Sequence, residues 1–384
     1  MTLTGREREI VDLLRLDPLL DAAALAERLG STRAAVSVHL SNLTRKGVVL
    51  GRGYLVRAEA DSVLVVGGAV LDTKVRTAAA PVLGTSNPGA ASATVGGVGR
   101  NIAENLARLG RPTVLVAAVG DDPAGETVLQ RTGAAGVDCR HVVVSPHPTG
   151  TYAAVLDDHG DLHIAVADMR ATDELAVADL DVVPSLLAGA DAVVVDANLD
   201  ATVIRWLLAA AQDAGVRSLV EPVSVAKATA AAAVFDGSVR VHTVTPNVDE
   251  LAALVGHPVA DTVDDVRAAA DLLHAHGVEH VWVRRGMRGS LLSTAGAGDA
   301  GSRAVLVGAP AVDVADVTGA GDSMTAGYVH ALLDGADVVE AARYGQVLAA
   351  LTCASADTVR ADLTAALVAA HLTPTQPPTE ELSR

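Results

Sequence analysis

The chain has 384 residues, enough for two or three domains and at least one substantial hydrophobic core. Half of the residues are hydrophobic and 20% are charged, which excludes a disordered or fibrous chain. Aromatic residues make up only 2%, which argues against a surface of stacked rings for single-stranded nucleic acid. No apolar run approaches the roughly 18–20 residues of a membrane-spanning helix, and charges of both signs interrupt Met1–Arg15. We therefore expect a cytoplasmic protein with no membrane partner.

The net charge of −17 is unevenly distributed along the chain. Residues 1–57 carry nine Arg and Lys against six Asp and Glu, a net charge of +3, so residues 58–384 carry −20. Between Arg28 and Arg57 there are six basic residues and no acidic one. This asymmetry predicts a basic N-terminal module, placed at residues 1–58, joined to an acidic body.

Three helix patterns occupy the basic module. The apolar spacing predicts helices over Arg6–Leu14, over Asp21–Leu29, and from a cap at Ser31-Thr32 to about residue 45. In the third helix we expect Ala35, Val38 and Leu43 to face the core. Two short helices joined by a glycine turn are typical of a helix-turn-helix.

A short hairpin pattern follows these helices. Two apolar triplets, 48–50 and 54–56, flank Gly51-Arg52-Gly53, which predicts a tight turn with Arg52 at its tip. The whole module resembles the winged-helix domains of bacterial regulators. The resemblance implies that the third helix enters the major groove of double-stranded DNA, with Arg45, Lys46 and Arg52 neutralising phosphates. A two-fold operator would require a homodimer, and a small dimerisation module is the alternative reading.

From residue 62 onward, short apolar runs alternate with helix patterns. The runs suited to buried strands are Val63–Val66, Val114–Val119, Ala192–Val195, Leu219–Val220, His242–Val244 and Val281–Val283. This order predicts an α/β fold with a mostly parallel sheet covered by helices on both faces. A ligand site is expected at the carboxyl ends of the strands.

One segment departs from this alternation. Thr151–Leu156 and Leu162–Ala167 are extended runs joined by a polar turn, which predicts an antiparallel hairpin. With the Ser- and Gly-rich stretch Thr85–Thr94, the hairpin could form a small sheet over the pocket. We therefore expect a β lid built from segments near 70–95 and 148–168.

Two glycine-rich segments point to a ligand. In the first, a strand ends in Gly67-Gly68 and Asp72 follows, where a carboxylate could accept hydrogen bonds from sugar hydroxyls. In the second, Gly96-Gly97-Val98-Gly99 opens a helix that contains Asn101, so that free backbone N–H groups face the pocket. This second segment is neither a phosphate loop of the Gly-Lys-Ser/Thr type nor a dinucleotide motif.

A third segment, Asp316-Val317-Thr318-Gly319-Ala320-Gly321-Asp322, is the sharpest signal. Small residues lead into a helix expected from Ala326 to about residue 333, so the backbone N–H groups of Gly319, Ala320 and Gly321 could form an anion hole. Asp322 would lie beside the positive end of the helix dipole, so we expect it to be ionised at neutral pH and able to take a proton from a hydroxyl. Taken alone, it could equally be an N-terminal charge partner.

Together, the last two segments resemble the signatures of the PfkB, or ribokinase-like, family of carbohydrate and nucleoside kinases. Gly96, Gly97 and Asn101 match the first signature, and Asp316 with Thr318–Asp322 matches the second. The resemblance implies a ribokinase-like three-layer αβα sandwich with a small β lid, at residues 61–370, preceded by the winged helix-turn-helix domain. Residues 371–384 form a polar tail to which we assign no function.

The family resemblance also implies roles for individual residues. Asp322 would be the base, with Gly319, Ala320 and Gly321 holding the phosphoryl group. Further matches concern substrate, nucleotide and metal binding. The substrate positions are Asp72, Gly96, Gly97 and Asn101, the nucleotide positions are Asn247, Glu250, Gly286 and Gly289, and the metal positions are Glu250 for Mg²⁺ and Asp316 with Thr318 for K⁺. The implied cofactors are ATP, Mg²⁺ and K⁺.

Within the family, three details are most similar to pseudouridine kinases. They are Ser86-Asn87-Pro88-Gly89, the loop GGVGRNIAENLARLG, and Glu221-Pro222-Val223-Ser224 followed by Lys227. The implied reaction is the ATP-dependent phosphorylation of the 5′-hydroxyl of pseudouridine. Inosine, guanosine or free ribose as acceptor, or a nucleoside-sensing transcriptional regulator built on a kinase fold, are the alternatives.

Several polar residues could read the base or the phosphates. Asn87 and Asp168 are candidates for the base edge, although each could equally be a turn or cap residue. Lys227 could neutralise ATP phosphates or lie in solvent. Arg100 could approach the anion or point into solvent from the start of its helix.

Overall fold

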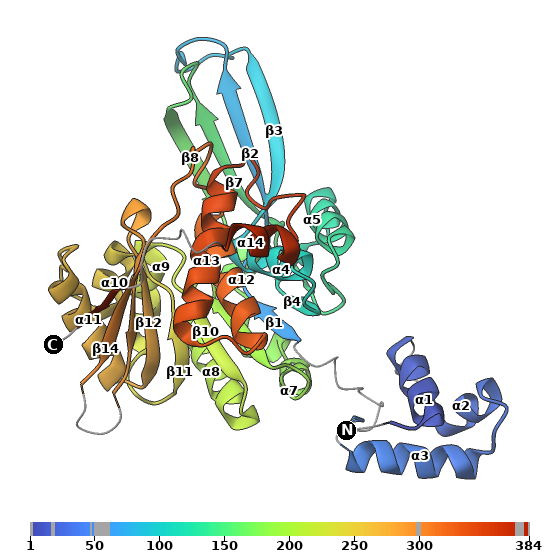
Figure 1. The fold of residues 1–384 in the computed structure, drawn as a ribbon. Coiled ribbons are helices and arrows are strands. Elements are labelled where there is room, and N and C mark those ends of the chain that lie inside the picture. The colour runs from blue at the N-terminus through green and yellow to red at the C-terminus, as the bar shows by residue number, and fades with distance from the viewer. Residues whose placement is uncertain are drawn as a thin grey trace.

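The computed structural model describes residues 3–16, 20–46, 48–49, 62–296, 301–372 and 380–382. Figure 1 shows two folded parts, a small helical module and a larger α/β body. The hairpin predicted around Arg52 lies outside the described residues, and so does most of the predicted tail. No helix among the described residues is both long and apolar enough to cross a membrane.

The helical module consists of α1 (Gly5–Leu16), α2 (Ala22–Arg28) and α3 (Arg33–Arg45), which confirms the three predicted helices. The side chains of Asp21 and Thr32 cap α2 and α3 by accepting bonds from backbone N–H groups of the first turn.

The predicted inward face of α3 was wrong in part. Val36, Leu40 and Leu43 are buried, whereas Val38 is 59% exposed. Residues four and three apart share one face of an α-helix, and a residue two positions from Val36 projects from the opposite face.

The body is built on a nine-stranded sheet with the order β15-β14-β13-β12-β11-β10-β9-β1-β4. All strands from β4 to β12 are parallel, and the remaining pairs are antiparallel. The parallel strands are β1 (Val63–Val66), β4 (Thr113–Val116), β9 (Ala192–Asp196), β10 (Arg217–Glu221), β11 (Val241–Val244) and β12 (Val278–Arg284). The antiparallel ones are β13 (Ser290–Thr294), β14 (Arg303–Val307) and β15 (Glu380–Leu382). The sequence did not predict these last three, and β15 shows that part of the expected tail belongs to the sheet.

Helices cover both faces of this sheet, as predicted, and Figure 1 shows the three layers. One face carries α7 (Val183–Leu187), α8 (Ala201–Ala214), α9 (Val225–Ala231), α10 (Val248–Val255) and α11 (Val263–Ala275). The other carries α4 (Val98–Arg108), α5 (Pro123–Ala134), α12 (Ala320–Leu333) and α13 (Val338–Cys353), and α14 (Ala365–His371) packs against α13. Strand β1 is apolar throughout because Leu64 and Val66 enter one core while Val63 and Val65 enter the other.

A second sheet, with the order β3-β2-β7-β8, projects from the sandwich (Figure 1). Strands β7 (Gly150–Leu156) and β8 (Leu162–Asp168) form the predicted antiparallel hairpin. Strands β2 (Val70–Thr77) and β3 (Gly89–Gly96) pair antiparallel, and β2 runs parallel to β7. We call this four-stranded unit the lid sheet. Asp72, expected in a loop after a strand, lies inside β2 because the chain turns at Gly67–Ala69 and extends again from residue 70.

The body contains further short elements near the lid sheet and between the main strands. They are β5 (Ala118–Gly120), β6 (Val143–Ser145), α6 (Arg170–Asp173), and the 3₁₀ turns at Val177–Asp179, Ala232–Val234 and Gly286–Arg288. The predicted run Val114–Val119 is thus divided between two sheets.

Candidate active site

Asp196, at the carboxyl end of β9, joins two of the glycine segments. Its Oδ2 accepts hydrogen bonds from the backbone N–H of Gly68 (2.8 Å) and of Gly99 (2.7 Å). A β-carbon at Gly67 would overlap the Asp196 carboxylate, so glycine is required there for the close approach. The sequence analysis overlooked this buried aspartate, although its place at the end of an apolar strand was a signal.

The start of α4 comes close to the beginning of β2. Gly97 is the N-cap of α4 with φ +96°, and a β-carbon there would overlap the carbonyl of Gly68. A β-carbon at Gly96 would overlap the carboxylate of Asp72. Partial burial raises the pKa of Asp72, and the charges of Lys74 and Arg100 offset only part of this rise. The structure therefore brings Gly96, Gly97 and Asp72 together.

Asn101 and Asp322 meet where α4 packs against α12. The Asn101 Nδ2 donates a hydrogen bond of 2.7 Å to the Asp322 Oδ2, and both residues are buried. Arg100, next to Asn101, is only 1% exposed; it donates to the Asn101 Oδ1 and forms an ion pair with Glu104. The solvent-facing alternative for Arg100 was wrong, because its guanidinium has these partners inside the body.

The protonation expected for Asp322 needs correction. Burial raises its pKa to about 7, and the charges of Glu221 and Asp196 act in the same direction. The Asn101 hydrogen bond and the charge of Arg284 lower the pKa without offsetting burial. Asp322 does lie in the first turn of α12, but the loss of hydration outweighs the helix dipole. It is therefore poised between its two protonation states near neutral pH.

The glycine loop before Asp322 is set by backbone geometry. Helix α12 begins at Ala320, six residues earlier than predicted, and its N-cap Gly319 has φ +80°. A β-carbon at Gly319 would overlap the carbonyl oxygen of Thr358. Upstream, the Asp316 Oδ1 accepts bonds from the Thr318 backbone N–H (2.8 Å) and Oγ1 (2.7 Å), and the former lowers the pKa of Asp316.

Asn247 and Glu250 form a capping box at the start of α10. The Asn247 Oδ1 accepts from the Glu250 N–H, and the Glu250 Oε2 accepts from the Asn247 N–H, both at 2.8 Å. Glu250 is buried, and burial raises its pKa. Its other carboxylate oxygen, Oε1, accepts no hydrogen bond from any residue that the structure describes, so it can bind a cation.

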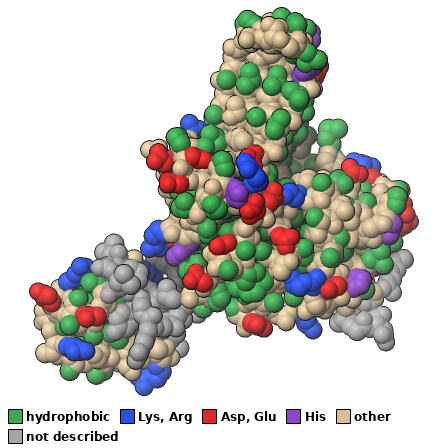
Figure 2. Space-filling view, turned by 180° about the vertical axis from the view of Figure 1, so that it is seen from behind, with side chains coloured by type: hydrophobic (Ala, Val, Ile, Leu, Met, Phe, Trp, Pro, Cys, Tyr) green, Lys and Arg blue, Asp and Glu red, His purple; other side chains and the backbone are tan. Residues whose placement is uncertain are grey.

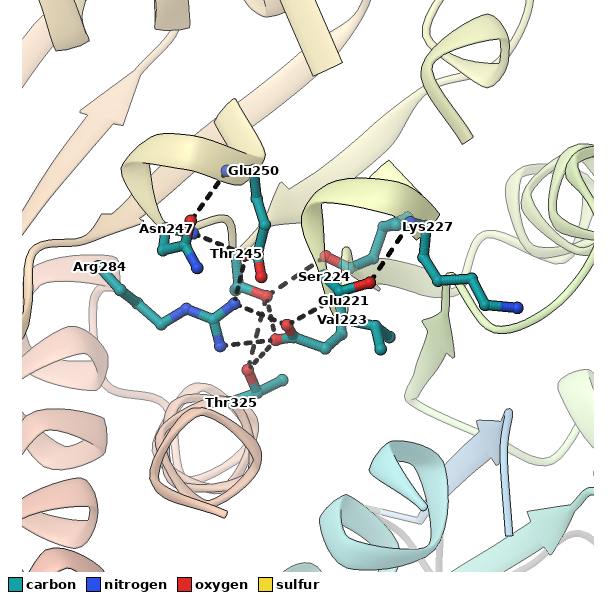
Figure 3. Close-up of polar contacts among 10 residues, drawn as sticks. Glu221, Val223, Ser224, Lys227, Thr245, Asn247, Glu250, Arg284 and Thr325 are labelled. Atoms are coloured by element: carbon teal, nitrogen blue, oxygen red, sulfur yellow. Dashed lines mark hydrogen bonds and ion pairs between the residues drawn. The ribbon is translucent and has the colours of Figure 1, made fainter. Parts of the chain in front are cut away.

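Glu221 and Arg284, which the sequence analysis did not assign to the site, connect these motifs (Figure 3). Arg284 Nη2 lies 2.7 Å from the Glu221 Oε1 and 3.0 Å from the Glu250 Oε2. Val223, two residues after Glu221, has φ +72°, a strained conformation for a β-branched residue. Glu221, Glu250, Arg284, Gly321 and Asp322 line one cavity of about 320 Å³.

A neighbouring apolar pocket of about 270 Å³ lies between α12, α13 and the turn after β12. Gly286 and Gly289 line it with positive φ, as a tight turn requires. The apolar part of the lining includes Met287, Val312, Val314, Val317, Met324 and Ala349. Arg284, Gly286 and Gly321 line both this pocket and the 320 Å³ cavity, so the two spaces are adjacent at these residues.

Three predicted site residues bond to partners outside this centre. Asn87 lies two residues before β3, where its side-chain amide accepts from the Val82 N–H and donates to the carbonyl oxygens of Val82 and Thr85. Seven residue steps along β3 separate Gly89 from Gly96, a distance of about 23 Å. Its amide therefore holds a turn.

Asp168 and Lys227 are engaged in ion pairs. Asp168 pairs with Arg170 at 2.6 Å, which lowers its pKa to about 2. Lys227 Nζ lies 2.9 Å from an Asp173 oxygen, and Figure 3 shows its side chain directed away from Glu221 and Arg284. Neither the phosphate role nor the purely solvated alternative for Lys227 agrees with this geometry.

Comparison with known proteins defines the class. A family model described as pfkB family carbohydrate kinase matches residues 60–365, and one described as winged helix-turn-helix DNA-binding matches residues 3–49. The protein is thus a kinase, a phosphotransferase with an alcohol group as acceptor. The chain belongs to the PfkB family, which confirms the predicted resemblance and the ribokinase-like fold.

Similar proteins support this assignment. The uncharacterized sugar kinase YeiI of Escherichia coli K12 is 32% identical over 354 residues, which cover 92% of this chain and 94% of that protein. The pseudouridine kinase of the same bacterium is 32% identical over 311 residues, covering 81% and 96%. A carbohydrate kinase from Agrobacterium tumefaciens superposes with a TM-score of 0.72 at 31% identity, covering 84% of this chain and 100% of that one. An Arabidopsis thaliana ribokinase complexed with ribose and ATP gives 0.66 at 25% identity, covering 78% and 94%.

Proposed function

We propose that the protein phosphorylates the 5′-hydroxyl of pseudouridine with ATP. The observation that carries the catalytic part is the buried Asp322, with its pKa raised to about 7, held by Asn101 beside the glycine loop. The acceptor rests on the 32% identity to a pseudouridine kinase and on the motifs shared with that group. YeiI is equally similar in sequence and leaves the acceptor to experiment.

The mechanism follows from the placement of these residues. Asp322 takes the proton of the acceptor hydroxyl, and Asn101 holds the carboxylate in position for it. The backbone N–H groups of Gly319 and Gly321 stabilise the charge of the transferring group at the start of α12, whereas the Ala320 N–H donates to the Val317 carbonyl oxygen at 3.2 Å. Asp196 is a positioning residue that fixes the Gly68 and Gly99 turns around the sugar site.

Substrate and cofactor positions follow the same geometry. Asp72 and Asn101 would bind sugar hydroxyls beside Gly96 and Gly97. The apolar pocket behind Gly286 and Gly289 would bind the adenine ring.

The residues at the proposed metal sites also fit the ions assigned to them. The open Glu250 Oε1, near Asn247, suits Mg²⁺. Asp316 and Thr318 remain our candidates for K⁺. ATP with Mg²⁺ supplies the phosphoryl group and neutralises part of its charge.

An acceptor panel tests the proposed reaction. Purified protein with ATP and Mg²⁺ is offered pseudouridine, uridine, inosine, guanosine, ribose and fructose, and ADP release is measured. We expect the highest kcat/KM for pseudouridine. A higher value for ribose or fructose would overturn the nucleoside assignment, and no turnover with any acceptor would overturn the kinase mechanism.

We propose that the lid sheet mediates a homodimer. The register places a row of apolar side chains on one face across all four strands, namely Val75, Ala91, Val155 and Ile164. On β8, Leu162, Ile164 and Val166 are 56–62% exposed, and Figure 2 shows hydrophobic side chains over the projecting sheet. A contiguous exposed apolar face of this kind marks an interaction surface.

The dimer is tested by light scattering after gel filtration. We expect a dimer for the wild type and a monomer for Ile164→Asp, because a buried charge without a partner opposes association. Leu272→Asp, at an exposed leucine on α11, is the matched control and should stay dimeric. A monomeric wild type at micromolar concentration would contradict this proposal.

We propose that the N-terminal module binds double-stranded DNA through α3. Its exposed stripe contains Arg33, Ser37, Val38 and Arg45, suitable for phosphates, base edges and a thymine methyl group. Lys46 was assigned to phosphates, but its Nζ lies 2.8 Å from both oxygens of the buried Glu7. It therefore connects α3 to α1 inside the module.

Salt dependence tests the DNA interaction. The full chain is titrated with a duplex selected from a random library, over a range of salt concentrations. Arg33→Ala with Arg45→Ala should lower affinity and reduce the salt slope by about two, since each phosphate contact contributes about one. Arg8→Ala, at an exposed position of α1, is the control and should bind DNA like wild type. Binding that ignores salt would return the module to a dimerisation role.

A further inference from the structure

Arg284, the last residue of β12, holds the carboxylates of two different motifs together. Its Nη2 donates to the Glu221 Oε1 (2.7 Å) and the Glu250 Oε2 (3.0 Å), and its Nη1 donates to the Glu221 Oε2 (3.1 Å). The Arg284 side chain is 15% exposed, and both carboxylates are almost fully buried. Burial alone would lower the pKa of Arg284, but the two glutamates raise it. The guanidinium is therefore a fixed positive charge.

Hydroxyl groups from two further elements anchor this arrangement. Thr245 Oγ1 (2.7 Å) and Thr325 Oγ1 (2.9 Å) both donate to the Glu221 Oε2 (Figure 3). Glu221 is thus held by α12 and by the segment after β11, as well as by Arg284. Because the Glu221 carboxylate is fixed by these hydroxyl groups and binds Arg284 through both of its oxygens, it also fixes the orientation of the Arg284 guanidinium plane.

The guanidinium retains donors for a ligand. Arg284 has five N–H groups and donates three of them to the glutamates, so one Nη1–H and Nε–H have no acceptor among the described residues. Nη1 lies against the Cα of Gly321, where a β-carbon would overlap it. One side of the guanidinium therefore faces the glycine loop at the start of α12.

The charge of the surrounding cavity makes this arginine distinctive. The described residues that line the 320 Å³ cavity include three carboxylates, those of Glu221, Glu250 and Asp322, and one cation, Arg284. Because Asp322 lines this cavity, a phosphoryl group transferred to an acceptor beside Asp322 would enter it. Apart from a metal ion bound at Glu250, Arg284 is the one positive charge that the described lining residues would offer such a group beside the loop N–H groups.

We propose that Arg284 is a further catalytic residue that donates hydrogen bonds to the transferring phosphoryl group. This rests on the proposed kinase function. The bond between the γ-phosphorus and the ADP oxygen breaks, the bond to the acceptor oxygen forms, and the hydroxyl proton goes to Asp322. ADP leaves with the electron pair of the broken bond, and Arg284 itself is unchanged. Its hydrogen bonds strengthen as negative charge spreads over the phosphoryl oxygens.

A transition-state analogue separates this role from a purely structural one. The affinity of ADP, alone and with aluminium fluoride, is measured by calorimetry in the presence of Mg²⁺ and the preferred acceptor. Arg284→Lys keeps a positive charge between the glutamates but loses the planar fork. We expect it to weaken binding of the ADP–fluoride complex about 100-fold, to lower kcat by a similar factor, and to leave ADP affinity nearly unchanged.

The neighbouring Arg285 provides the matched control. Its Nε pairs with Asp261 at 2.6 Å, and Asp261 has a second partner in Arg288, so Arg285→Gln leaves no charge unpaired. This variant should behave like wild type in both measurements. Should Arg284→Lys not fold, Arg284→Gln combined with Glu221→Gln removes one charge of each sign and is measured in its place.

The outcomes distinguish the two proposals. If Arg284→Lys binds ADP with aluminium fluoride as tightly as the wild-type protein does, the catalytic role of Arg284 is overturned while the kinase function stands. Equal weakening for ADP alone and for the complex would assign Arg284 to nucleotide positioning and overturn the catalytic role. If wild-type protein neither turns over nor binds the fluoride complex, the kinase function itself fails.

Discussion

Replacing Asp322 with Asn is expected to lower kcat by about 10³-fold, because the side chain keeps its shape but can no longer accept the hydroxyl proton. Asn101 should still contact residue 322, since an amide oxygen can accept the bond now made to Oδ2. ATP affinity measured by calorimetry should therefore stay within about twofold of wild type, which assigns the loss to the chemical step.

Asp337→Asn is the matched control for this change. Asp337 caps α13 through the N–H groups of Val339 and Glu340, a role that Asn fills equally well, so activity should be retained. Wild-type turnover by the Asp322→Asn protein would show that another group takes the proton.

The same assignment fixes the direction of the pH dependence. With its pKa raised to about 7, Asp322 is mostly protonated and inactive as a base below that pH, so kcat/KM should rise through neutrality. The groups that set this value are Asn101, Glu221, Arg284 and Asp196. A profile that stays flat from about pH 5.5 to about pH 8.5 would contradict the base assignment.

Replacing Gly319 with Ala is expected to lower kcat by about 100-fold. Its φ of +80° is unfavourable for alanine, and the added β-carbon would overlap the Thr358 carbonyl oxygen. The loop must therefore move, which displaces the N–H groups that face the transferring phosphoryl group. Steady-state kinetics and thermal unfolding are measured together.

Gly335→Ala is the control that separates displacement of the loop from the cost of a positive φ. Gly335 follows the other end of α12 with φ +89° and has no atom within 4 Å of a built β-carbon. Both variants carry the same conformational cost of about 1–2 kcal/mol in stability, but only Gly319→Ala should lose activity. Equal activity of the two variants would show that the loop position is not critical.

Much of the fold could be predicted because it depends on local pattern. The apolar strands read as buried on both faces, and the caps at Asp21 and Thr32 marked helix starts. The hairpin β7–β8 followed from two extended runs and a polar turn. The antiparallel strands β13 to β15 were not recognised, and the pairing of β15 with β14 joins segments that are far apart in the chain.

The site was predictable where a motif is continuous in the chain. Asn101 and Asp322, 221 positions apart, were each singled out by a glycine-rich neighbourhood, and the structure joins them by a hydrogen bond. Glu221 belongs to a segment noted for its similarity to pseudouridine kinases, but Arg284 lies 63 positions away, so nothing local indicated that the two form one cluster. Asn87 and Lys227 had plausible residue types, but only their neighbours showed that a turn and an ion pair occupy them.

By itself, the sequence determined the family, the order of the two parts, the glycine loop and the identity of its carboxylate. These properties depend on residue type and short spacing, which can be seen in the sequence without knowing how the chain folds. Only the tertiary structure decided the protonation of Asp322, the cation beside it and the partners of each polar side chain. Those depend on desolvation and on charges brought within a few ångströms from separate strands, and folding alone creates such proximity.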